Sequence, residues 1–514
     1  MKKLTTALIA IMLLAPFAFS GGIVTNTNQS AAYGRYFSRY STIEIDAVYF
    51  NPAGLTKMND GFHFSLNNQS IFQTWTINND YALLNSDEFI GTVAAPIFPS
   101  VYGSYKTGKL AISIGFNPIG GGGSALFEAG IPSVELGIAS LPAAMAALGA
   151  TGDYSYSSSL EGSSVYFGLQ AGLTYEINDM ISVYGGARYV MANNSYVGSI
   201  TDVSLATISD PLTYTSVTAN ADAFQGGSDG MEAIMTASPV TATLTFAELE
   251  GLYIIDATQR ATMEGGLRAL GIPQAQIDDM ELQQSQVVYE TTATSMYTAA
   301  GALADQKLDT KQTGSGFTPI VGVNLSFMEG KLNVGLKYEF ITKLVLTNET
   351  IFDIVTDAEG NTMFPDGAEV NADMPALLSG GATFNVTDAL QVAGGFEYYF
   401  DQNVNWDGRE EFIEANLYNF NFSAQYDISE KFLISAGYSY NKTGVTDDYQ
   451  DDLSFSLSSS SIGFGGAWNI KENIQLNLGY TMVLYVDDEV PVTGYTTTYA
   501  KETKLFAYGI NFSF

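Results

Sequence analysis

The chain ends with KLFAYGINFSF, residues 504–514, and this stretch decides the fold. From Phe506 to Phe514 its large apolar residues alternate with small or polar residues. A period of two, with one bulky apolar face and one small or polar face, is typical of a β-strand between two different environments. The pattern therefore predicts a strand of a transmembrane β-barrel, with lipid outside and a polar lumen inside.

The same alternation recurs along most of the chain, and short polar turns interrupt it. Asn, Asp and Gly are frequent in these turns, as tight turns between antiparallel strands require. Six such turns pair twelve strands and one further strand stands at each end, which predicts an all-β, fourteen-stranded antiparallel barrel. The turns lie at residues 106–109, 177–180, 328–331, 386–389, 428–431 and 470–473. The expected strands run over about 61–77, 97–106, 109–118, 161–176, 181–200, 314–328, 331–348, 374–386, 389–402, 412–427, 432–443, 453–469 (with a bulge near 458–461), 474–488 and 502–514.

The chain begins with the features of a secretory signal peptide. Lys2 and Lys3 precede an apolar run over residues 4–14, and the small-x-small pattern AFS ends at Ser20. A membrane anchor is the alternative, but the apolar run is short for a membrane span. We expect residues 1–20 to be cleaved, so that the mature chain is exported.

Composition excludes several classes of function. The chain has no cysteine, which excludes thiol catalysis and thiolate metal sites, and its one histidine, His63, excludes sites built from several histidines. Ser-His-Asp catalysis would have to use His63, and no G-x-S-x-G motif accompanies it. A net charge of −33 opposes nucleic-acid binding. We therefore expect no enzyme activity, catalytic residue, metal, cofactor or nucleic-acid partner.

Acidic residues cluster between the expected strands, as at Asp447, Asp448, Asp451 and Asp452. We interpret these clusters as solvated loops. Weak calcium sites, or divalent bridges to anionic lipid, are the alternative because carboxylates are hard oxygen ligands. The spacing of the acidic residues matches no complete EF-hand.

Two connections between strands have helical character. Residues 133–148 are small and apolar, and residues 201–313 form a much longer insertion. In the longer one, Thr245 and Glu248 make a capping box for a helix that begins near Phe246. A structureless loop of this length is uncommon, so we expect helices that pack over the barrel mouth. The expected extracellular insertions span about 119–160 and 201–313, and a second long helix covers about 274–305.

Residues 21–60 precede the first strand and do not alternate. They include apolar residues such as Ile45, Val48 and Phe50, too many to be left in water. A wide barrel encloses a lumen that the side chains of its wall cannot fill. We therefore expect residues 21–60 to form a plug and residues 61–514 to form the barrel.

The plug segment carries the stretch DAVYFNPAGL, residues 46–55. Together with Gly34, Arg35 and Asp46, this stretch resembles the N-terminal hatch of the FadL/TodX family of outer-membrane transport proteins. The neighbouring stretches TNTNQSAA and DGFHFSLNNQSIFQT are similar to Bacteroidetes-type members of that family. The resemblance in residues covers about 21–75, and over the remaining chain it is one of architecture. The hatch motif comprises Asn51, Pro52, Ala53 and Gly54.

The resemblance implies a barrel in the outer membrane of a Gram-negative bacterium. Its partners would be membrane lipid and a hydrophobic small molecule, a long-chain fatty acid or similar compound that diffuses passively through the barrel. In the family, a shift of the hatch opens a path to a gap beside a kinked third strand. A monomer, and assembly by the barrel assembly machinery through the strand ending at Phe514, are also implied. The alternatives are a transporter of aromatic hydrocarbons or another amphiphile, an adhesin or structural barrel, and an outer-membrane enzyme.

The third expected strand reads KLAISIGFNPIGGGG, residues 109–123. Pro118 cannot donate a ladder hydrogen bond, and Gly120 and the glycines after it weaken the strand. These residues and Asn117 are candidates for a kink. Alternatively, the strand ends at Asn117 and the glycines belong to a loop.

Three basic residues are expected on lumen-facing positions of the strands, namely Arg188, Lys337 and Lys343. A ligand carboxylate in a mostly apolar pocket needs a cation, so these residues are candidates for binding it. Alternatively, they pair with lumenal acids such as Glu339 or Glu397, because buried charges need partners.

Overall fold

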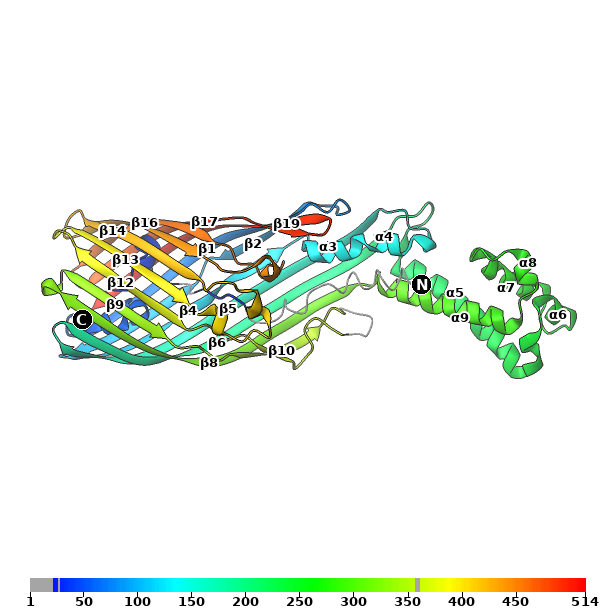
Figure 1. Ribbon diagram of the computed structural model, residues 1–514, viewed down its shortest axis with the longest axis horizontal. Helices are drawn as coiled ribbons and strands as arrows, with labels where there is room; N and C mark the ends of the chain where they lie inside the picture. The colour runs from blue at the N-terminus through cyan, green and yellow to red at the C-terminus, as the bar shows by residue number, and fades with distance from the viewer. Residues whose placement is uncertain (1–21, 26–27, 356–360) are drawn as a thin grey trace. The chain divides into compact units, whose positions relative to one another are not determined.

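A computed structural model describes residues 22–25, 28–355 and 361–514. Within those residues, nineteen strand segments form one sheet. They make up the fourteen positions of a closed antiparallel barrel (Figure 1), so the predicted fold is confirmed. The predicted signal peptide lies outside the described residues. The segments are β1 (Gly61–Asn79), β2 (Glu88–Ala95), β3 (Pro99–Thr107), β4 (Leu110–Phe127), β5 (Tyr154–Asn178), β6 (Ile181–Leu205), β7 (Leu212–Thr213), β8 (Gln306–Phe327), β9 (Leu332–Glu339), β10 (Val345–Phe352), β11 (Glu369–Asn371), β12 (Leu377–Asn385), β13 (Leu390–Tyr399), β14 (Tyr418–Asp427), β15 (Phe432–Lys442), β16 (Ser459–Lys471), β17 (Ile474–Tyr485), β18 (Asp488–Val492) and β19 (Tyr495–Ser513).

The number of segments exceeds the number of barrel positions because some positions are interrupted. β2 and β3 both pair with β1 on one side and with β4 on the other, so they share a position. β9 and β10 both pair with β8. β17 and β18 both pair with β19.

The barrel closes between its first and last strands. β1 pairs with β19 from His63, opposite Ser513, to Asn79, opposite Thr497. The terminal stretch alternates as predicted, with Phe506 exposed and Ala507 buried. Among the described strands this closure leaves no unpaired edge, as a barrel in a bilayer requires.

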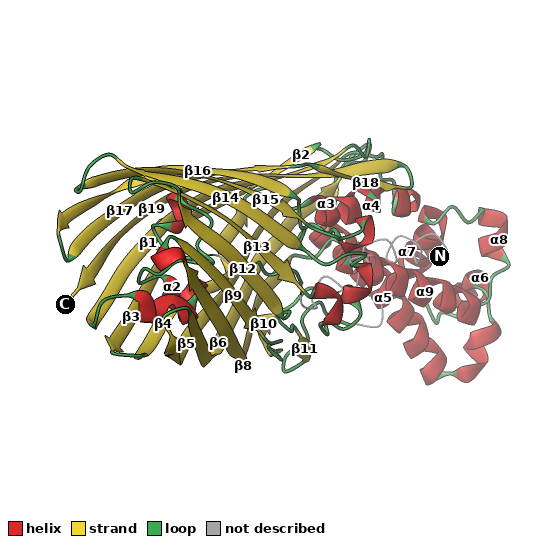
Figure 2. Cartoon of the chain, turned by 60° about the vertical axis from the view of Figure 1, so that its left-hand side comes forward, coloured by secondary structure: helices red, strands yellow, loops and turns green. Residues whose placement is uncertain are grey.

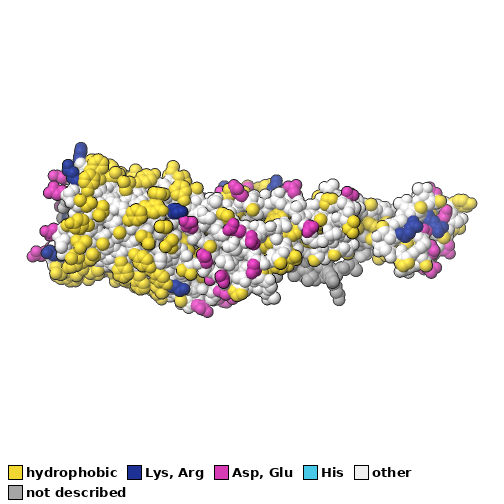
Figure 3. All heavy atoms as spheres, turned by 90° about the horizontal axis from the view of Figure 1, so that it is seen from above, with side chains coloured by type: hydrophobic (Ala, Val, Ile, Leu, Met, Phe, Trp, Pro, Cys, Tyr) yellow, Lys and Arg dark blue, Asp and Glu magenta, His cyan; other side chains and the backbone are white. Residues whose placement is uncertain are grey.

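Apolar side chains cover the outside of the strands. Figure 3 shows them gathered over the barrel, with charged side chains concentrated beyond this band. On β14, exposed Phe420 and Phe422 alternate with buried Asn419, Asn421 and Ser423. An apolar exterior around a polar interior is the arrangement that a lipid bilayer selects, so the barrel is a transmembrane barrel.

Some predicted strand bounds were wrong. The second position begins with β2, which the prediction missed, and β5 and β6 are each 25 residues long and extend beyond their predicted bounds. The chain over 453–458 is not a strand and forms no bulge in β16. Phe455 and Leu457 turn inward and join a buried cluster with Phe127 and Tyr499. These alternating apolar residues therefore face the lumen and not lipid.

A second compact unit contains residues 136–157 and 200–306. α6 begins at Phe246 with the predicted capping box of Thr245 and Glu248. The single helix expected over about 274–305 is wrong, because the chain leaves the helix after Asp278 and starts a new one with a cap at Glu281. Among the described residues, no helix combines the length and apolarity needed to span a membrane. The helices are α3 (Pro132–Ala139), α4 (Leu141–Ala144), α5 (Tyr214–Ala237), α6 (Phe246–Gly251), α7 (Ala257–Ala269), α8 (Gln274–Asp278) and α9 (Leu282–Gly301), with 3₁₀ turns η3 (Ala146–Leu148) and η4 (Pro239–Thr243).

This helical unit has a core of its own. Tyr289 of α9 packs with Leu249 and Leu267, and its hydroxyl donates to the Met263 carbonyl oxygen at 2.7 Å. The expectation that these helices cover the barrel mouth stays a prediction. The remaining 3₁₀ turns are η5 (Met328–Gly330), η6 (Asp401–Asn403), η7 (Arg409–Phe412) and η8 (Asp447–Tyr449).

The segment before β1 lies inside the barrel, and Figure 2 shows α2 within the ring of strands. We call the described residues 22–25 and 28–60 the hatch. Ala31 N–H donates to Asn67 Oδ1 of β1 at 3.1 Å, and Asn51 Nδ2 donates to Asn324 Oδ1 of β8 at 2.8 Å. Contacts with opposite walls hold the hatch across the lumen. Its elements are η1 (Tyr33–Arg35), α2 (Ala47–Phe50) and η2 (Pro52–Lys57).

Candidate functional site

A cavity of about 470 Å³ lies in the lumen of the barrel. Apolar and polar side chains share its wall, and a cavity of this size and character suits a small amphiphilic ligand. The hatch contributes Val24 and Tyr33, β4 contributes Gly121, and β19 contributes Lys501.

Lys501 stands in this wall among aromatic rings. Its Nζ lies 4.0 Å from the ring centroid of Trp75 and 4.2 Å from that of Phe455, with Tyr485 further away at 6.0 Å. Aromatic faces stabilise a cation without neutralising it. Among the described residues Lys501 forms no ion pair, and its one hydrogen bond, to the Phe455 carbonyl oxygen, is long at 3.5 Å. The ammonium therefore keeps donors free for an anion.

Arg409, also in the cavity wall, already has a protein anion as its partner. Arg409 Nη2 donates to Asp451 Oδ2 at 2.7 Å and to the carbonyl oxygens of Tyr449 and Ser454. Asp451 and Asp452 are thus not the solvated loop residues that we expected, because the loop folds inward and uses them as acceptors. In the part of the chain that the structure describes, no group of three or more His, Cys, Asp or Glu side chains is placed to hold a metal ion.

The predicted carboxylate-binding residues lie elsewhere. Arg188 and Lys337 meet at Glu339, with N–O distances of 2.5 and 2.6 Å, and neither lines the cavity. Lys337 Nζ also donates to the Tyr49 carbonyl oxygen of the hatch at 2.8 Å. This is the alternative arrangement, in which lumenal cations pair with lumenal acids. Their part in ligand binding stays a prediction.

Lys343 does not keep the lumen-facing position expected of it. It lies between β9 and β10, where the strand breaks, and its side chain is 70% exposed. Its Nζ pairs with Asp373 Oδ2 at 2.6 Å. The expected parity fails here because a break in a strand resets the alternation of faces.

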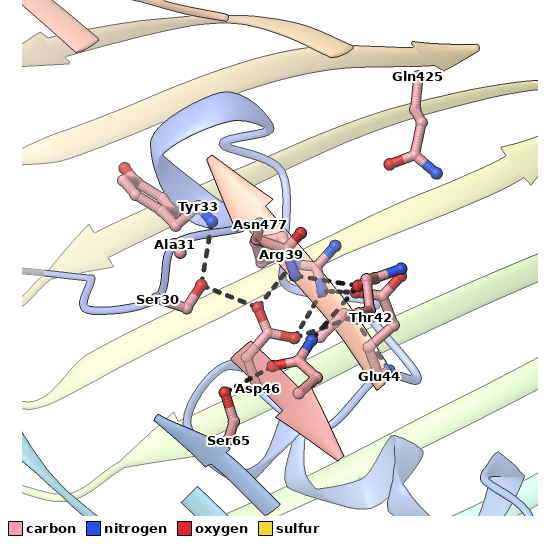
Figure 4. A network of polar contacts seen from close by, with 12 residues as sticks. Ser30, Ala31, Tyr33, Arg39, Thr42, Glu44, Asp46, Ser65, Gln425 and Asn477 are labelled. Atoms are coloured by element: carbon pink, nitrogen blue, oxygen red, sulfur yellow. Dashed lines mark hydrogen bonds and ion pairs between the residues drawn. The ribbon is translucent and has the colours of Figure 1, made fainter. Parts of the chain in front are cut away.

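A buried ion pair organises the centre of the hatch (Figure 4). Arg39 Nε donates to Asp46 Oδ2 at 2.8 Å and Arg39 Nη2 to Asp46 Oδ1 at 2.5 Å. Ser30 Oγ donates to the same carboxylate, and Arg39 also reaches Glu44 at 2.7 Å. The Arg39 guanidinium holds the pKa of Glu44 below its ordinary value. Three separate stretches of the hatch therefore converge on one charged cluster.

The hatch motif joins this cluster to the wall. Asn51 Nδ2 donates to the Thr42 carbonyl oxygen at 3.0 Å. A Cβ at Gly54 would lie 2.6 Å from both Asn51 Nδ2 and that oxygen, so only glycine fits there. The Pro52 carbonyl oxygen accepts from Thr174 of β5. Ala53, the remaining motif residue, packs against Tyr184 and Ile320 of the wall.

Solved structures share this fold over most of their length. A FadL homologue of Pseudomonas aeruginosa matches with a TM-score of 0.58 at 11% identity, covering 96% of this chain and 99% of that chain. The barrel has the FadL-type fold. The Pseudomonas putida toluene transporter TodX matches with a TM-score of 0.51 at 11% identity, covering 91% of this chain and 94% of that chain. No family model and no curated protein matches the chain.

The third strand of this FadL-type barrel is distorted where the glycines lie. β4 continues past Asn117 to Phe127, so it does not end at the proline. Its register against β5 shifts between Pro118 and Gly120 and again between Gly121 and Gly123. Gly121 and Gly123 have φ angles of 85° and 96°, which favour glycine. A role of this kink in ligand exit stays a prediction.

Sequence reasoning missed Lys501 although a signal for it was present. β19 begins at Tyr495, whereas we expected the strand to start near residue 502. In the last strand of the FadL-type barrel, Ala507 faces the lumen. Every second residue before it lies on the same face, back to position 501. Trp75 is the register partner of Lys501 across the seam of the barrel.

A buried acid predicts that the stability of the FadL-type barrel depends on pH. Asp401, in the loop after β13, is buried and accepts the Leu417 N–H at 3.0 Å. Burial raises the pKa of Asp401 to about 6. Because this pKa lies above the unfolded value of about 4, the folded state binds the proton more tightly. The stabilisation is complete below about pH 4 and is lost as the pH rises through 6.

We expect Asp401→Asn to raise the thermal stability at pH 7.5 by on the order of 2 kcal/mol, because it removes the cost of the buried charge and keeps an acceptor. Melting curves in detergent from pH 4.5 to 7.5 should become flatter, although Asp451, whose pKa burial also raises to about 6, keeps part of the slope. Asp388→Asn, in an exposed turn, is the control. An unchanged pH profile in Asp401→Asn would show that this carboxyl is not responsible.

Proposed function

We propose that this protein is an outer-membrane channel for the uptake of hydrophobic small molecules, and not an enzyme. The molecules would diffuse passively through the barrel, and the hatch would control their passage. The observation that carries the proposal is the lumenal cavity between hatch and wall, on a fold shared with a FadL homologue and a toluene transporter. Its location in the outer membrane agrees with the closed, lipid-facing barrel.

Lys501 favours an amphiphile with a carboxylate, such as a long-chain fatty acid, over a neutral hydrocarbon. A cation enclosed by Trp75 and Phe455 lacks a protein anion among the described residues, and a bound carboxylate would supply one. Arg409 differs from Lys501 because it already has a protein anion: its Nη2 group donates to Asp451 and to two carbonyl oxygens. An aromatic hydrocarbon, the alternative ligand, would use the apolar wall only.

The kink of β4 suggests the exit. Gly121 and Gly123 line the cavity at the place where the register of β4 shifts. A lateral path from the cavity through this part of the wall would deliver an apolar ligand directly to the membrane. Monomeric state and recognition of the strand ending at Phe514 by the barrel assembly machinery stay predictions.

We expect Lys501→Met to weaken the binding of palmitate by about 10-fold to 100-fold, because it removes one charge-assisted hydrogen bond. Binding should be measured with purified protein in lipid nanodiscs, with toluene as the neutral probe. Toluene binding should change little. Lys501→Arg should retain most of the palmitate affinity.

Lys504→Met on the same strand is the matched control, because its side chain is about half exposed and pairs with Glu502. It should leave both affinities unchanged. Equal palmitate affinity in Lys501→Met and the wild type would contradict the role of Lys501. Binding of toluene without binding of palmitate would favour the hydrocarbon alternative.

A further inference from the structure

A row of polar side chains crosses the wall of the lumenal cavity from β13 to β19, and we call it the polar row. Its successive members are register partners on neighbouring strands, namely Glu397, Asn419, Asn441, Ser459 and Tyr485. Lys501 of β19 comes next and is the last member, with its Nζ 6.0 Å from the ring centroid of Tyr485. Every residue of the polar row lines the cavity.

An acid stands at one end of the polar row. Glu397 is 2% exposed, lines the cavity and forms no ion pair among the described residues. Tyr40 and Asn28 of the hatch lie near its carboxylate, and both are neutral. Lys337, two strands away in register, already pairs with Glu339 at 2.6 Å. A buried carboxylate without a cation is costly, so a cation supplied by a ligand would stabilise it.

The two ends of the polar row therefore carry opposite charges, and neither has a protein partner of opposite charge among the described residues. Five steps from strand to strand separate Glu397 from Lys501. At about 4.8 Å a step, the two backbones lie about 24 Å apart along the wall, and side chains that point inward bring the charges to roughly 15–20 Å. One ligand reaches both ends only if its own charges are similarly far apart.

Apolar side chains of the same cavity complete the site. Val93, Phe127 and Leu160 line the cavity and belong to one buried cluster with Phe455. An aliphatic chain between the two ends of the polar row would bury its surface against such side chains. The cavity volume of about 470 Å³ lies within the range of sites that enclose small organic ligands.

We propose that the polar row binds a bipolar amphiphile, with its ammonium at Glu397 and its carboxylate at Lys501. The chemical class is a long aliphatic chain that carries the ammonium at the end remote from the carboxylate. A fatty acid uses only the Lys501 end, and an alkylamine uses only the Glu397 end. This inference rests on the proposed function and adds to it a second binding site for a head group, of opposite charge.

Three probes with chains of equal length test the two ends separately. Palmitate, hexadecylamine and 16-aminohexadecanoic acid are titrated against the full chain in lipid nanodiscs, and empty nanodiscs give the background. The wild type should bind 16-aminohexadecanoic acid at least about 10-fold more tightly than palmitate, because this probe adds a second charge-assisted hydrogen bond. Hexadecylamine should bind the wild type as well.

Glu397→Gln removes the negative charge and keeps the size of the side chain. It should weaken the binding of hexadecylamine by about 10-fold to 100-fold. Palmitate should instead bind about 2-fold to 5-fold more tightly, because a negative charge has left the cavity. A merely structural role of Glu397 would weaken both probes. Glu430→Gln, in an exposed turn, removes the same charge outside the cavity and should leave all three affinities unchanged.

Hexadecylamine binding that is unchanged in Glu397→Gln would overturn the inference and leave the proposed function intact. Weakening of both hexadecylamine and palmitate in this variant, or equal affinity of the wild type for palmitate and 16-aminohexadecanoic acid, would do the same. Binding of toluene but of none of the three charged probes would also overturn only the inference. If the wild type binds neither toluene nor palmitate, the proposed function fails and this inference fails with it.

Discussion

Replacing Asp46 by alanine is expected to loosen the hatch and turn the plugged barrel into a leaky one. The Arg39 side chain is 3% exposed and gives two hydrogen bonds to Asp46. Without Asp46, only Glu44 remains, and its side chain is 40% exposed. Removing one partner of a buried ion pair costs about 3–5 kcal/mol. Because Arg39 keeps its pair with Glu44, we expect a cost near the lower limit.

Single-channel recordings in planar bilayers measure this loosening directly. The wild type should show small or no steady conductance, and Asp46→Ala should show frequent open events. Proteolysis should cut the hatch of the variant faster. Asp60→Asn is the control, because Asp60 makes an exposed ion pair with Lys106 that contributes little. Closed channels and a resistant hatch in Asp46→Ala would contradict the central role of this pair.

Replacing Glu339 by alanine is expected to be the most destabilising change in the barrel wall. Glu339 is the acid that both Arg188 and Lys337 contact, and all three residues are buried. Its loss leaves two cations without an anion, although Arg188 keeps Gln170 and Lys337 keeps the Tyr49 carbonyl oxygen. We expect a loss of about 3–5 kcal/mol in the free energy of unfolding, measured by urea titration in lipid vesicles.

A triple variant separates the cost of unpaired charge from the loss of packing. Arg188→Met, Lys337→Met and Glu339→Leu together remove every charge of the cluster, and such replacements are often neutral for stability. We expect this variant to be more stable than Glu339→Ala. If it also binds palmitate as the wild type does, Arg188 and Lys337 do not hold the ligand carboxylate. Stability equal to that of Glu339→Ala would show that packing dominates.

Local patterns were predicted correctly because every second residue of a strand faces the same environment. The faces of β14 and β19 and the cap of α6 all depend on residues near one another in the chain. Pro118 and the glycines act on their own backbone, so the sequence offered a kink of β4 as one of two interpretations, and the structure shows the shift in register. The bounds of the strands failed where the pattern continues past the membrane, as in β5.

The sequence by itself therefore determined a closed lipid-facing barrel with a hatch inside it, since alternation and turn residues act locally. Only the tertiary structure decided which lumenal cations have a protein anion and which, like Lys501, have none among the described residues. Glu339 lies beside Lys337 in the chain but meets Arg188 only in the folded lumen, and the rings of Trp75 and Phe455 reach Lys501 from distant segments. Partners in a barrel lumen come from opposite walls and from loops that fold inward. A local periodicity in the sequence therefore does not predict them.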